Sequence, residues 1–91
     1  MLPELVLPTI HMNGTSARCL LEGYMEARSA VMRASEAIQA IEFNARDYYP
    51  QGGNAFRVAQ EQHISRLKRL AEISDELLRI AEHVSDALPV R

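Results

Sequence analysis

A heptad pattern of apolar residues in the first half of the chain constrains the fold most strongly. Its members, spaced alternately four and three residues apart, are Leu20, Tyr24, Ala27, Val31, Ala34, Ile38 and Ile41. This spacing places one apolar seam along a single helix. It predicts a helix over residues 16–43, roughly 42 Å long at about 1.5 Å per residue. Small residues recur every seven positions beside the seam, and they would let a second helix approach closely: Gly23, Ala30 and Ala37.

A second helix is predicted over residues 54–87, after a loop at 44–53. Its apolar positions cover more than one narrow stripe and include Phe56, Ala59, Ile64, Leu67, Leu70, Ile73, Leu77, Ile80, Ala81, Val84 and Leu88. A two-helix hairpin offers only one partner face per helix, so the surplus apolar surface predicts self-association. We therefore expect an all-α fold, an antiparallel two-helix hairpin that closes a helical bundle as a homodimer or larger oligomer.

The N-terminal residues 1–14 are expected to form an extended arm within the same single domain, residues 1–91. Pro3 and Pro8 each favour extended geometry in the preceding residue. The arm is also apolar, which predicts that it packs against the helices as an extended segment or short strand.

Polar residues and glycine mark the ends of the predicted helices. Asn13 and Gly14 form a turn signal, and Thr15 or Ser16 then supplies an N-cap oxygen for the first helix. Asn44 is the expected left-handed cap at its other end.

Composition and charge exclude several classes of function. The net charge of −2 gives no global basic field to hold DNA or RNA. The single Cys19 excludes an internal disulfide and suits a reducing compartment. No apolar run approaches the roughly 20 residues of a membrane span, and the N-terminus lacks the basic region of a signal peptide. We expect a soluble cytoplasmic protein with no membrane partner.

The loop between the helices carries more chemistry than turning the chain requires. It reads Asn44-Ala45-Arg46-Asp47-Tyr48-Tyr49-Pro50-Gln51-Gly52-Gly53. Tyr48 and Tyr49 can stack on a planar ligand, and Arg46 can hold a phosphate or carboxylate. Gly52 and Gly53 can bring bare backbone amides to an oxyanion. The alternative is that one tyrosine packs under the hairpin while the Pro-Gln-Gly-Gly segment simply turns the chain.

Both predicted helices carry an arginine in the first turn, where acidic residues are usually preferred. Arg18 and Arg57 stand in these first turns, and an arginine beside a helix N-terminus concentrates positive charge for an anion. The alternative is pairing across the hairpin, with Arg18 near Glu82 or Asp86. Arg57 would then lie near Glu42.

The remaining polar residues do not predict catalysis, a cofactor or a metal site. His63 and His83 are about 30 Å apart along one helix, and no Glu-x-x-His spacing occurs. His63 is in line with Phe56, which predicts a half-buried structural histidine. His11 either donates to a ligand or caps the end of the bundle. No nucleophile–base pair is recognisable, so we expect a non-enzymatic protein.

Charge along the second predicted helix is segregated. The first half holds Arg57, Arg66, Lys68 and Arg69 with Glu61, and the second holds Glu72, Asp75, Glu76, Glu82 and Asp86 with Arg79. Two such helices packed antiparallel would complement each other. Solvated faces and intersubunit pairs are favoured over a nucleic-acid surface.

Two motifs together carry a resemblance to known proteins. They are Pro8-Thr9-Ile10-His11-Met12-Asn13-Gly14-Thr15-Ser16 and Arg46-Asp47-Tyr48-Tyr49-Pro50-Gln51-Gly52. With helices between and after them, they resemble a family of short uncharacterised proteins of bacteriophages and prophages. Small phage proteins often counter host defence, and one class consists of helical oligomers that sequester nucleotide signals. By analogy, the resemblance implies a function in the cytosol of a bacterial host.

The resulting expectation is non-enzymatic capture of a small anionic ligand such as a nucleotide immune signal. The predicted ligand-binding residues are His11, Asn13, Thr15, Arg18, Arg46, Tyr48, Tyr49, Gln51, Gly52, Gly53 and Arg57. The two motifs lie a helix length apart, so they can share one site only across the subunits of an antiparallel dimer. The alternative is a structural or protein-interaction module, such as a phage accessory protein or an inhibitor of a host protein.

Overall fold

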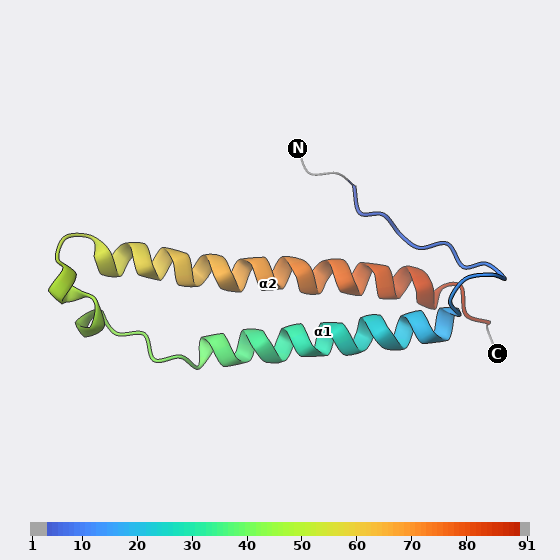
Figure 1. Cartoon of the computed structure of the whole chain (residues 1–91), viewed down its shortest axis with the longest axis horizontal. Coiled ribbons are helices and arrows are strands. Elements are labelled where there is room, and N and C mark those ends of the chain that lie inside the picture. Colours follow the sequence, from blue (N-terminus) through green and yellow to red (C-terminus); the bar gives the residue numbers. More distant parts are fainter. Residues whose placement is uncertain (1–3, 90–91) are drawn as a thin grey trace.

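The structure, a computed structural model, describes residues 4–89 of the chain. Two long helices, α1 (Ala17–Gln39) and α2 (Ala55–Ser85), run antiparallel and pack side by side along their lengths (Figure 1). Two short 3₁₀ turns, η1 (Ala45–Asp47) and η2 (Tyr49–Gln51), lie in the connection between them. Residues 4–89 contain no strand. The predicted all-α hairpin is confirmed, and it is a rod with extents of 61 × 30 × 20 Å.

Helix α1 begins as the sequence predicts but ends earlier. Ser16 is the N-cap, and its hydroxyl oxygen accepts a hydrogen bond of 3.1 Å from the backbone N–H of Cys19. The helix ends at Gln39, four residues before the predicted boundary at 43. Asn44 has an extended backbone, with φ −121° and ψ 140°, so the predicted left-handed cap is wrong. The early end frees Phe43 from the helix and lets it reach the loop residues.

Helix α2 follows its prediction within two residues at each end. Asn54 stands at its N-cap position without a side-chain capping hydrogen bond, and the first turn contains no acidic residue. The backbone N–H of Asp86 donates to the carbonyl of Glu82 at the other end, 3.1 Å away.

The predicted seam is half-buried at Leu20, Tyr24, Val31 and Ile38 but exposed at Ala27, Ala34 and Ile41. Ala27 and Ala34 are exposed, whereas their neighbours Arg28 and Ser35 are half-buried. The α1 residues that are buried or half-buried are Ala17, Leu20, Leu21, Tyr24, Arg28, Val31, Ser35 and Ile38. In the middle of α1, the half-buried positions are therefore shifted by one residue from the predicted seam, and the small residues Ala27 and Ala34 lie exposed beside them.

The fully buried part of the hairpin is confined to its open end, opposite the loop. Among the described residues, the buried positions are Ala17, Ala81 and Val84. Larger apolar side chains remain exposed elsewhere along the rod, including Met25, Met32, Val58, Ile64 and Ile73. The surplus apolar surface inferred from the sequence is thus present on the single chain.

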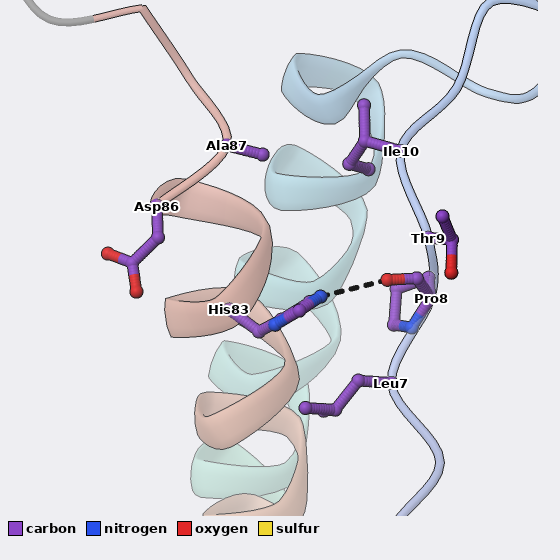
Figure 2. Close-up of a pocket in the computed structure, with 7 residues that line it drawn as sticks. All are labelled: Leu7, Pro8, Thr9, Ile10, His83, Asp86 and Ala87. Atoms are coloured by element: carbon purple, nitrogen blue, oxygen red, sulfur yellow. Dashed lines mark hydrogen bonds between the residues drawn. The ribbon is translucent and has the colours of Figure 1, made fainter.

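The N-terminal arm is extended and forms no strand over its described part, residues 4–14. It lies on the α2 side of the hairpin and reaches beyond the open end before α1 begins (Figure 1). His83 Nε2 lies 2.9 Å from the carbonyl oxygen of Pro8, and Leu7 points toward α2 beside it (Figure 2). The predicted turn is present, because the backbone N–H of Gly14 donates to the carbonyl of His11 at 3.1 Å. Neither α1 nor α2 is apolar enough to span a membrane, and the described residues include no other long helix.

Candidate functional site

An aromatic cluster holds the loop against the start of α2. Phe43 lies at its centre, with ring centroids 5.4 Å from Tyr48, 5.6 Å from Phe56 and 4.8 Å from the stacked ring of His63. Tyr48 also meets Phe56 at 6.0 Å. Offset and tilted rings at these distances attract one another. Tyr48 is therefore a support of the loop, as the alternative interpretation of the sequence had it, and His63 is half-buried as predicted.

The neighbouring loop residues face solvent and form what we call the tip: Arg46, Tyr49, Gln51, Gly52 and Gly53. Tyr49 is 72% exposed, although its neighbour Tyr48 is half-buried in the aromatic cluster. Gly52 has φ 75° and ψ −178°, and Gly53 has φ 55°. Residues other than glycine rarely adopt the backbone conformation of Gly52. The tip is thus a defined turn built on an aromatic base.

Arg57 is engaged locally and does not pair across the hairpin. Its Nη1 lies 2.7 Å from Oε1 of Glu61, one turn further along α2. The predicted alternative of a contact with Glu42 is wrong, because an i, i+4 partner on the same helix is already within reach. The arginine side chain remains 60% exposed beside the uncapped start of α2.

The other predicted ligand-binding residues lie at the open end of the hairpin, away from the tip (Figure 1). His11, Asn13, Thr15 and Arg18 are all exposed there. The ring of His11 covers its own turn, so that a Cβ added at Gly14 would come within 2.8 Å of His11 Nε2. The structure therefore does not bring the two groups of predicted residues together within one chain.

The predicted cross-hairpin pairing of Arg18 is also absent. Within residues 4–89 the ion pairs are Arg33 with Glu26 and Arg57 with Glu61. Arg18 is exposed, and neither Glu82 nor Asp86 comes within 4.0 Å of it.

Open depressions border both ends of the hairpin. Beside the tip, a depression of about 430 Å³ is lined by Tyr48, Gln51, Asn54, Ala55, Val58, Ala59 and Gln62. Asn54, Val58 and Gln62 were missed by the sequence analysis, although their spacing of four residues places them on one stripe of α2. At the open end, a similar depression lies between the arm and α2 around His83 (Figure 2).

A third depression, the Leu77 groove, lies along one flank between the two helices. It measures about 320 Å³ and is lined by Cys19, Leu20, Gly23, Tyr24, Ala27 and Leu77. The described residues contain no group of three or more histidine, cysteine or acidic side chains placed to hold a metal ion.

Comparisons with protein-family models, curated proteins and solved structures gave no match.

Proposed function

We propose that this chain is a non-enzymatic protein-interaction module that presents the tip of its hairpin to a partner protein. The observation that carries the proposal is the contrast between two adjacent tyrosines, one packed and one exposed. Tyr48 is packed into the aromatic cluster, whereas Tyr49 is 72% exposed.

The exposed side chains of the tip have the chemistry of a binding hot spot. Tyrosine and arginine are enriched among the residues that dominate protein–protein affinity, and Tyr49 and Arg46 stand three residues apart. A tyrosine offers a large contact area for little conformational entropy, and a supported loop has less freedom to lose on binding. In the phage setting implied by the sequence motifs, the partner would be a bacterial cytosolic protein.

Site-specific cross-linking tests this proposal. A photo-reactive phenylalanine derivative replaces Tyr49 in one chain and the exposed Ser29, on α1, in a control chain. Both are expressed in bacteria, irradiated and compared by mass spectrometry. We expect a product specific to position 49 that weakens at least severalfold when Arg46→Ala is added. Equal labelling from both positions, or a product indifferent to Arg46, would count against the tip as a binding surface.

Capture of a small anion such as a nucleotide is the second candidate. It is favoured by the start of α2, where the backbone has no side-chain cap and where the exposed Arg57, paired with Glu61, lies within the first turn. Tyr49, Gln51, Gly52 and Gly53 precede this helix start in the sequence. Tyr48 is packed in the aromatic cluster and is not assigned a ligand contact.

The second candidate is tested by thermal unfolding with a panel of mononucleotides and cyclic nucleotides. A ligand at 100 times its dissociation constant should add about 2.7 kcal/mol to the free energy of unfolding. That gain should disappear in Arg57→Ala. His11, Asn13, Thr15 and Arg18 would join the site only from a second subunit, so His11→Ala distinguishes a shared site from a local one.

A further inference from the structure

One flank of the hairpin combines exposed apolar surface with a groove. Ile73 is 43% exposed on α2, and Leu77 follows it by four residues on the same stripe. Leu77 lines the Leu77 groove together with small α1 residues, among them Gly23 and Ala27. A Cβ added at Gly23 would meet nothing within 4 Å. Another helix can therefore approach this flank closely.

We propose that this flank pairs with the same flank of a second copy, with the two α2 helices antiparallel and the two-fold axis at Ile73. A two-fold contact is self-complementary, so each residue before Ile73 on one copy meets a residue after Ile73 on the other. Ile73 stands near the middle of α2 (Ala55–Ser85), so the helices would overlap over most of their length. This arrangement is independent of what the tip binds.

Charge complementarity identifies the occupant as a second copy in this orientation. Arg69 precedes Ile73 by four residues and Glu76 follows it by three, which places both on the same side of α2. Antiparallel pairing sets Arg69 against Glu76 of the partner subunit, and the two-fold axis produces this pair twice. Neither residue belongs to an ion pair in the single chain, where the pairs within residues 4–89 lie elsewhere.

Other arrangements of two copies lack this complementarity. Parallel α2 helices would align the basic half with a basic half and the acidic half with an acidic half, which is repulsive. Pairing α2 with α1 of the partner would meet a helix on which both signs of charge are mixed along its length: Arg18, Glu22, Glu26, Arg28, Arg33 and Glu36. The depression beside Ile64 is lined by α2 residues alone, with Arg69 among them, so it is not a groove between the two helices.

Cysteine cross-linking locates the interface. Ile73→Cys and Ile64→Cys are each introduced into a Cys19→Ser chain and compared. The mass of the Cys19→Ser chain in solution is measured first by light scattering. The two isoleucines are matched, with exposures of 43% and 51%, but lie on opposite flanks of α2. We expect mild oxidation to link Ile73→Cys into a covalent dimer at least tenfold faster than Ile64→Cys. Equal linking, or a monomeric mass for the natural sequence up to the highest soluble concentration, would overturn the proposal.

A charge exchange tests the orientation. Arg69→Glu alone, or Glu76→Arg alone, creates two repulsive contacts and should raise the dimer dissociation constant by roughly ten- to thirtyfold. The double variant, Arg69→Glu with Glu76→Arg, restores opposite charges across the axis and should recover most of the affinity. Circular dichroism of each variant reports helix content separately. A double variant no tighter than the single variants would refute the antiparallel register.

Discussion

Removing the ring of Phe43 should destabilise the whole hairpin, although the residue lies outside both helices. Within the aromatic cluster, Phe43 contacts each of the other three rings, those of Tyr48, Phe56 and His63. A fully buried Phe→Ala change costs about 3–5 kcal/mol. Phe43 is half-buried, which reduces that figure to about 2 kcal/mol. The lost Phe–Tyr and Phe–Phe pairs add roughly 0.5 kcal/mol each, so we expect a loss of about 3 kcal/mol.

The assay is urea unfolding followed by helical circular dichroism, with both variants at the same protein concentration because self-association would shift the midpoint. With an m-value of about 1.5 kcal/mol/M, the midpoint of Phe43→Ala should fall by about 2 M. Tyr49→Ala is the control, since its ring is 72% exposed and should cost less than about 0.5 kcal/mol. A loss below about 1 kcal/mol for Phe43→Ala, or equal losses for the two variants, would refute the assigned role of the cluster.

Four further changes probe the ends and the glycines of the hairpin. Ser16→Ala removes the hydroxyl that accepts from the N–H of Cys19 and should cost about 1 kcal/mol in the same urea assay. Gly23→Ala should raise the free energy of unfolding by up to about 1 kcal/mol, because this helix-interior position has room for a methyl group. Gly52→Ala should lower it by about 1–3 kcal/mol because of its φ of 75° and ψ of −178°; a similar sign for the two glycines would contradict the backbone argument. His83→Ala removes the hydrogen bond to the arm, so limited proteolysis before residue 10 should accelerate while helix content stays unchanged.

Sequence periodicity was sufficient for the helices but not for the face that α1 buries. A heptad count treats Ala27 and Ala34 as core positions because they are apolar. Packing depends also on size, and the longer aliphatic stem of Arg28 covers more of α2 than an alanine methyl group does. The helix accordingly turns Arg28 inward, and the small residues become a flank. Only side-chain volume, weighed against the partner helix, distinguishes these two rotations.

The candidate site was predictable in location and only partly in detail. Two adjacent tyrosines in a turn cannot both pack beneath it, but the sequence does not say which one does. The answer depends on Phe43, which lies four residues beyond the end of α1 and packs against Tyr48. The pairing of Arg57 was within reach of the sequence, since Glu61 stands at the favourable i+4 position. The distant Glu42 had to compete with that local partner.

The placement of the best-packed residues has a consequence for how the hairpin folds. Phe43 and Phe56, near the loop, are 13 residues apart, whereas Ala17 and Ala81, at the open end, are 64 residues apart. Closing the longer loop costs about 1.4 kcal/mol more entropy, so we expect the aromatic cluster to form first and the helices to pair from there toward the open end. Conservative substitutions in the cluster should then slow folding, and Val84→Ala should mainly speed unfolding. The arm, bound at His83, would close over the part of the hairpin that forms last.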